Sequence, residues 1–172
     1  MRRVAAALLA ALLVGACAFG EIYADYGDAV DLQTADVIGT WHSGAKRSFT
    51  FAANGEFSAR GLPAAEFADF VDGTVPTRID GSGTWSLERA GSATDSPHAT
   101  VALTFTRLAG EPTRSSGPDL SALRQDNGKV FLFFFYVGPG GNSWTSYEKC
   151  PDGSTETVCR PAPRPPAVPR AG

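Results

Sequence analysis

Apolar and polar residues alternate along most of the middle of this chain, and this alternation restricts it to β-structure. Phe49 and Phe51 alternate with polar residues, residues 53–55 (ANG) supply a turn, and Phe57 resumes the alternation on the way back. The same pattern recurs farther along the chain, which predicts about eight short strands. They fall within residues 36–41, 47–60 (a hairpin), 83–88, 99–106, 120–137 (a hairpin about Asn127-Gly128) and 143–149.

One predicted strand is apolar on both faces. In VFLFFFY, Phe131, Phe133 and Phe135 point to one side, and the residues between them point to the other. An open edge strand of this composition would aggregate. We therefore expect a central position, with one face in the core and the other face covered. Tight turns between neighbours favour a mainly β, antiparallel meander.

A single short helix is predicted over Pro63–Val71. The proline suits a first helical turn, and Ala64, Phe67 and Phe70 recur at helical spacing. We expect this helix to cover one face of the strand at residues 130–136.

The motif Gly-Thr-Trp occurs twice, ending at Trp41 and at Trp85. The progression GTW, FTFAANGEF, GTW and VALTF resembles the small lipocalin-like domains of secreted bacterial lipoproteins, and it is most similar to uncharacterised lipoproteins of high-GC actinobacteria. The resemblance implies a barrel in which Trp41 packs across one end. A closed barrel, a half-open barrel and a two-sheet sandwich all remain compatible with the pattern.

The N-terminus has the features of an export signal. Arg2 and Arg3 precede an unbroken apolar run of eleven residues, Val4–Val14. This run is too short to span a bilayer, which takes ~20 residues, and it suits a signal peptide. The following VGAC resembles the bacterial lipobox, which implies that Cys17 is acylated and becomes the first mature residue. The alternative is an ordinary signal peptide that happens to contain a cysteine.

Lipidation of Cys17 leaves Cys150 and Cys159, which bracket a turn signal, Pro151-Asp152-Gly153. A structural disulfide is expected in an oxidising compartment, and a redox or metal pair is the alternative. The predicted organisation is therefore a signal peptide at 1–16, a lipid anchor and spacer at 17–35, a β domain at 36–160 and a proline-rich disordered tail at 161–172.

Charge and motifs exclude several classes of function. The net charge is −3, and removal of residues 1–16 with their two arginines makes it −5, which argues against nucleic acid as a partner. His42 and His98 are expected at the surface. With the cysteines assigned, no spacing suggests a metal site, a cofactor motif or a catalytic residue.

Three functions remain open for a protein anchored at the extracytoplasmic face of the cell membrane. The first is a non-catalytic module that binds an apolar small molecule or an envelope protein. The second is a structural or interaction lipoprotein with no small-molecule site, and the third is a hydrolase without a recognisable motif. The residues that would line an apolar ligand site, or simply form the core, are Trp41, Trp85, Phe131, Phe133 and Phe135.

Overall fold

The computed structural model describes residues 27–67, 76–89, 99–138 and 141–151, and the side chains of residues 135–143 fall outside that description. The elements are β1 (Asp28–Ala29), α3 (Thr34–Val37), β2 (Gly39–Ser43), β3 (Arg47–Phe51), β4 (Glu56–Pro63), the 3-10 turn η1 (Ala64–Glu66), β5 (Arg78–Glu88), β6 (Thr100–Leu108), β7 (Glu111–Ser116), β8 (Leu120–Arg124), β9 (Val130–Gly138) and β10 (Gly141–Lys149).

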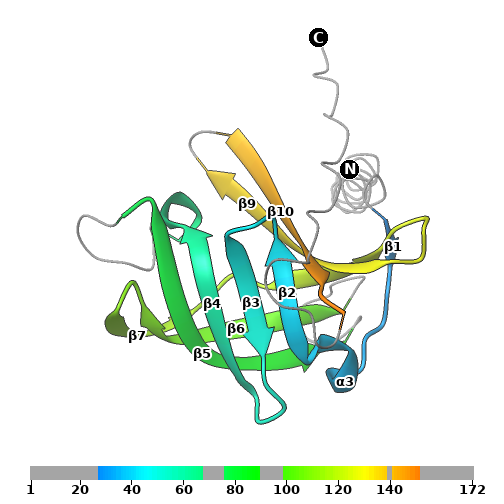
Figure 1. Cartoon of the computed structure of the whole chain (residues 1–172), viewed down its shortest axis with the longest axis horizontal. Coiled ribbons are helices and arrows are strands. Elements are labelled where there is room, and N and C mark those ends of the chain that lie inside the picture. Colours follow the sequence, from blue (N-terminus) through cyan, green and yellow to red (C-terminus); the bar gives the residue numbers. More distant parts are fainter. Residues whose placement is uncertain (1–26, 68–75, 90–98, 139–140, 152–172) are drawn as a thin grey trace, which may run out of the picture.

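Eight of the strands close into an antiparallel barrel (Figure 1). The hydrogen-bonded order runs from β2 through β6, passes to β8, β9 and β10, and returns to β2. These eight are the strands that the alternation predicts, and the central position expected for β9 is confirmed, since it lies between β8 and β10. The two remaining strands are additions, with β1 paired to β8 and β7 paired to β6.

Two Asn-Gly turns have the same construction and set the register of their hairpins. In one, Gly55 has a φ of 80° and the Glu56 amide donates to Asn54 Oδ1 at 3.0 Å. In the other, Gly128 has a φ of 80° and the Lys129 amide donates to Asn127 Oδ1 at 2.9 Å. Both turns are predicted from the sequence, because glycine adopts positive φ without a steric penalty.

Aromatic side chains fill the interior of the barrel. Phe49 lies at the middle of the cluster, with its ring 4.9 Å from that of Tyr147 and 6.1 Å from that of Phe57. Phe57 in turn meets Phe105 edge-on at 5.1 Å. Because these rings come from β3, β4, β6 and β10, the core joins strands from both halves of the barrel.

Strand β9 has two apolar faces, as expected. Its Leu132 and Phe134 belong to the main core, whereas Phe131 and Phe133 form a second buried cluster with Leu123. Trp144 of β10 packs on this second cluster, with its ring 4.6 Å from that of Phe133. Phe131 and Phe133 therefore lie apart from the aromatic interior.

The α-helix predicted from Pro63 is wrong over the residues that the structure describes. Pro63 ends β4, and the chain then makes only the 3-10 turn η1. Phe67, which directly follows η1, stacks on Phe134 at 5.7 Å and meets Phe105 edge-on at 5.8 Å. The described part of this segment, up to Phe67, thus contributes to the main core and does not belong to the cluster of Phe131 and Phe133. Phe70 and Val71 lie outside the described residues.

The packed part of the chain begins earlier than expected. The predicted spacer ends at residue 35, yet Val30 and Leu32 are buried in the main core, and α3 follows with Val37 fully buried. Apolar side chains at these positions therefore extend the main core. Among the described residues, no helix has the length and apolar character needed to cross a bilayer.

Candidate functional site

Trp41 lies at the end of the barrel beside α3. Its glycine neighbour in the motif, Gly39, has a φ of 120°, a conformation that side chains rarely adopt. The Trp41 ring is 1% exposed, and its Nε1–H donates to the carbonyl of Val37 at 2.8 Å. Lys149, at the end of β10, lies over the ring at 5.9 Å. Trp41 therefore packs across one barrel end, as the resemblance implies.

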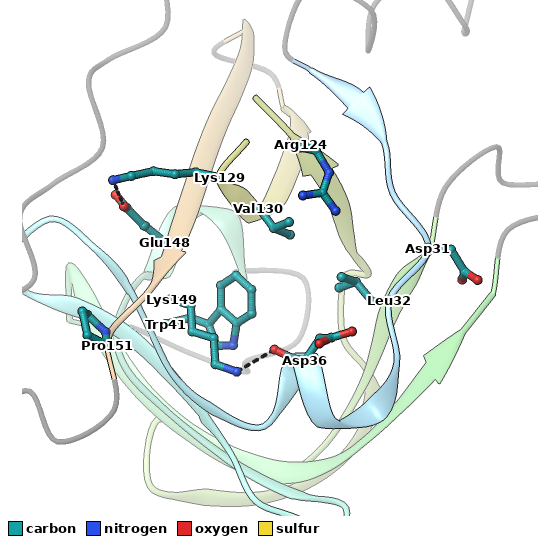
Figure 2. Close-up of a pocket in the computed structure, with 10 residues that line it drawn as sticks. All are labelled: Asp31, Leu32, Asp36, Trp41, Arg124, Lys129, Val130, Glu148, Lys149 and Pro151. Carbon is teal, nitrogen blue, oxygen red and sulfur yellow. Dashed lines mark hydrogen bonds and ion pairs between the residues drawn. The ribbon is translucent and has the colours of Figure 1, made fainter. Parts of the chain in front are cut away.

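A pocket of about 580 Å³ opens at this end (Figure 2). We call it the barrel-end pocket. Its volume lies within the ~300–1,000 Å³ usual for small-molecule sites, and its lining combines apolar and charged side chains. The lining residues are Asp31, Leu32, Asp36, Trp41, Arg124, Lys129, Val130, Glu148, Lys149 and Pro151.

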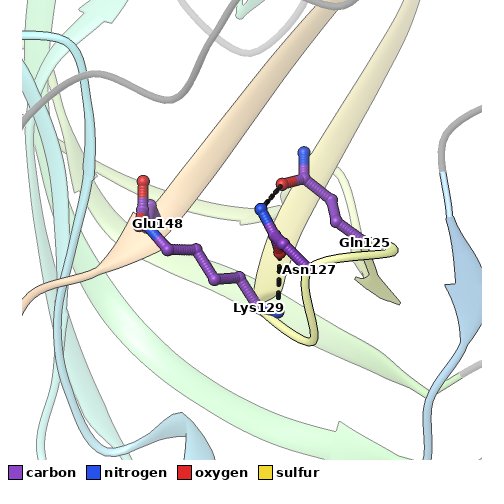
Figure 3. A network of polar contacts seen from close by, with 4 residues as sticks. All are labelled: Gln125, Asn127, Lys129 and Glu148. Carbon is purple, nitrogen blue, oxygen red and sulfur yellow. Dashed lines mark hydrogen bonds and ion pairs between the residues drawn. The ribbon is translucent and has the colours of Figure 1, made fainter.

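The β8–β9 turn positions one wall of the pocket (Figure 3). The amide of Gly128 donates to the Gln125 carbonyl at 2.8 Å, and Asn127 Nδ2 donates to Gln125 Oε1 at 3.3 Å. Lys129 then forms an ion pair with Glu148 of β10. These contacts fix the turn internally and join it to β10. They therefore also fix the positions of Arg124, Lys129 and Val130 in the pocket wall.

A separate polar cluster lies within the barrel. Arg47 Nη1 donates to Thr145 Oγ1 at 3.2 Å, and that hydroxyl donates to Glu66 Oε1 at 3.4 Å. Tyr147 is buried beside them. Burial, and secondarily the Glu66 carboxylate, raise the pKa of Tyr147 far above its usual value, although Arg47 opposes the shift. The phenol thus stays protonated at physiological pH, which suits packing better than acid–base chemistry.

The structure places the predicted lining residues in different surroundings. Trp41 contacts the barrel-end pocket, whereas Trp85 is 8% exposed within the main core and donates its Nε1–H to the Ala52 carbonyl at 3.1 Å. Phe131 and Phe133 belong to the second cluster. Phe135 pairs with Trp144 in the β9–β10 ladder, and its side chain lies outside the described residues.

The sequence did not single out the charged lining of the pocket, in particular Arg124 and Lys149. These residues end β8 and β10, with the whole of β9 between them, and nothing in their local sequence links them. The nearest signal is the Asn127-Gly128 turn, which lies beside Arg124 and so could have marked this end of the hairpin.

Other predicted positions have mixed outcomes. His42 is 8% exposed, so its expected surface location is wrong. Cys150 is buried at 9% exposure directly after β10. Its predicted partner Cys159, together with Cys17 and His98, lies outside the described residues, and the disulfide stays a prediction. Within the described ranges, no three His, Cys, Asp or Glu side chains cluster as metal ligands would.

Searches of protein families, curated proteins and solved structures found no match to this chain.

Proposed function

We propose that this protein is a lipid-anchored, non-catalytic binding module of the bacterial cell envelope. Acylated Cys17 would hold it at the extracytoplasmic face of the membrane, and the barrel would present its ligand site to that compartment. The lipobox-like VGAC supports the anchor. The resemblance to actinobacterial lipoproteins supports the same proposal.

The observation that carries the binding role is the barrel-end pocket. Its apolar residues, Leu32, Trp41 and Val130, lie among charged side chains. Ligand sites typically combine an apolar lining with a few polar groups that fix orientation. The aromatic interior offers a different environment, because its rings pack against one another. We therefore propose that the ligand binds at the barrel end, not along the barrel axis.

The packed interior also favours a second candidate, a structural or interaction lipoprotein with no small-molecule site. In that case Trp41 and Lys149 only close the barrel. The two candidates differ in whether a small molecule occupies the barrel-end pocket.

Native mass spectrometry of the protein extracted from its own membrane separates them. A binding module retains a small molecule beyond the acyl anchor, and Val130→Trp, which places a large ring in the pocket, abolishes retention. Thr84→Trp, at an exposed position on β5, is the matched control and leaves it intact. An empty protein, or retention that survives Val130→Trp, favours the structural candidate.

The anchor is tested independently of the pocket. The wild-type chain should partition with membranes and into detergent, while Cys17→Ser should remain unprocessed or be released. One acyl chain gives only marginal membrane binding, so firm retention requires a cysteine that carries more than one chain. Equal solubility of mutant and wild type, with both cleaved, contradicts the anchor and leaves the binding role standing.

A further inference from the structure

We propose that the barrel-end pocket selects an anionic amphiphile, a small molecule with an apolar ring or chain and one carboxylate, sulfonate or phosphate group. The inference rests on the proposed binding role and adds the class of ligand. It follows from the directions and contacts of the charged side chains of the lining, which include three acids and three bases.

Two of the three acids are engaged within the protein. Glu148 forms an ion pair with Lys129, so both charges are satisfied. Asp36 keeps its charge, because a backbone amide is neutral, but its carboxylate already accepts the Gln33 amide at 2.8 Å as part of the capping box of α3. The third acid, Asp31, lies at the edge of the pocket, and Figure 2 shows its carboxylate directed away from the middle.

Two of the three bases, Lys149 and Arg124, also keep their charge. Lys149 Nζ donates to the backbone carbonyl of Asp36 at 2.8 Å, and Arg124 Nη1 donates to that of Gly128 at 3.1 Å. Backbone carbonyls carry no net charge, and neither base forms an ion pair with another described residue. A lysine has three N–H donors and an arginine has five, so both retain donors for a ligand.

These two bases flank apolar surface. Lys149 lies over the Trp41 ring, and the Arg124 guanidinium points into the pocket beside Val130 and Leu32 (Figure 2). An anionic group that accepts charge-assisted hydrogen bonds from either base would place its apolar part against Val130 and Leu32. A cation would find the Asp31 carboxylate directed away from the pocket and the Asp36 carboxylate held in the capping box of α3.

A pair of dyes that share one ring system tests the charge directly. Anilinonaphthalene sulfonate is anionic, and N-phenylnaphthylamine is its uncharged counterpart. Calorimetric titration of the full chain carrying Cys17→Ser, which removes the proposed acyl group, measures both without detergent. We expect the sulfonate to bind about tenfold more tightly, corresponding to ~1.4 kcal/mol. Its affinity should fall with added salt, which screens exposed charges.

Variants assign the effect to the two bases. Lys149→Met and Arg124→Gln should each weaken sulfonate binding several-fold and leave the neutral dye unchanged. Lys46→Met and Arg114→Gln remove exposed bases outside the pocket lining and should change neither dye. Circular dichroism confirms that each variant is folded.

The outcomes separate this inference from the proposed function. If both dyes bind equally and Val130→Trp blocks both, the pocket is a binding site but the selection for anions is wrong. If neither dye binds, or if both bind regardless of Val130→Trp, the binding role itself is contradicted. Sulfonate preference that Lys149→Met and Arg124→Gln leave intact likewise overturns the inference.

Discussion

At the scale of single residues, Thr100 offers a direct test of the cost of an unpaired hydroxyl. Thr100 begins β6, is 6% exposed, and its Oγ1 has no hydrogen-bond partner among the described residues. Burial of a hydroxyl without a partner is unfavourable. Thr100→Val keeps the shape of the side chain and should therefore stabilise the fold by about 1 kcal/mol, measured by urea unfolding.

Thr106→Val is the matched control on the same strand. Thr106 is exposed, and its hydroxyl donates to the Ser82 carbonyl at 3.3 Å. Thr106→Val should slightly lower the free energy of unfolding, because it removes this hydrogen bond. A loss at Thr100 as large as that at Thr106 would mean that the buried hydroxyl has a partner in solution.

Asp119 is a second residue with a defined consequence for stability. Partial burial, and next the negative charge of Glu88, raise the pKa of the Asp119 carboxyl above its usual 3.8. The folded state therefore binds this proton more tightly than the unfolded state, and ionised Asp119 costs stability at neutral pH. Asp119→Asn should raise the melting temperature at pH 7. The gain should shrink as the pH falls through the folded pKa towards the unfolded value.

Glu88 provides the control for this prediction. Glu88→Gln removes part of the same repulsion, so it should give a smaller gain at pH 7. The double variant should gain less than the two single gains combined, since the two carboxylates interact. Strictly additive gains, or a gain from Asp119→Asn that does not change with pH, would contradict the coupling.

At the scale of the element, the bulge in β4 brings two hairpins close together. Gly61 lies where the β4–β5 register shifts, has a φ of +63°, and donates its amide to Asp80 Oδ1 at 2.8 Å. A Cβ on Gly61 would lie 1.9 Å from the Lys46 carbonyl oxygen. Gly61→Ala should therefore cost more than the ~1–2 kcal/mol of left-handed backbone strain alone.

A substitution at Gly110 separates the backbone strain from the steric clash with the Lys46 carbonyl. Gly110 has a φ of +88°, and a Cβ there would meet no atom of the described residues within 4 Å. Gly110→Ala should show the strain alone, so the difference between the two variants in urea unfolding measures the close approach. Equal losses would indicate that the β2–β3 hairpin moves away from the bulge at little cost.

The strands were predictable where their signals are local. Alternation and the Asn-Gly turns identify all eight barrel strands, because each signal lies within a few residues. β7 was missed because its sequence, EPTRSS, is polar throughout and has no apolar period. The α-helix over Pro63–Val71 was predicted wrongly for a similar reason. Ala64 and Phe67 are three residues apart, and a 3-10 turn also places residues i and i+3 on one side.

At the scale of the whole molecule, the site was predictable only through Trp41. The resemblance carried by the Gly-Thr-Trp motif implies a barrel-end position for that residue, but the other pocket residues come from β8, β9, β10, the residues next to these strands and the segment around α3. Only closure of the barrel brings these segments together. The local sequence pattern contains no information on that closure. The contact between Lys149 and Trp41 could therefore not be predicted from the sequence.

Barrel closure depends on two short ladders. At the β6–β8 junction the described residues pair only as Thr100–Ser121 and Val101–Leu120, whereas β5 and β6 pair along the whole of Gly81–Glu88. The β10–β2 junction is equally short and ends at the Lys149–Trp41 pair. Short ladders open locally at lower free energy than long ones.

Hydrogen exchange should therefore distinguish the junctions from the rest of the barrel. The amide of Ala122, bonded to the Ala99 carbonyl across the β6–β8 junction, and that of Cys150, bonded to the Thr40 carbonyl across the β10–β2 junction, should exchange faster than amides in the β5–β6 ladder. Saturating anilinonaphthalene sulfonate should protect Cys150 and leave Ala122 unchanged. The pocket lining includes Lys149 and Trp41, which pair across the β10–β2 junction, and none of the described residues that pair across the β6–β8 junction. Uniform exchange across all three ladders would mean that the barrel opens only by global unfolding. Equal protection of both junctions would mean that the dye stabilises the whole fold without engaging the β10–β2 end.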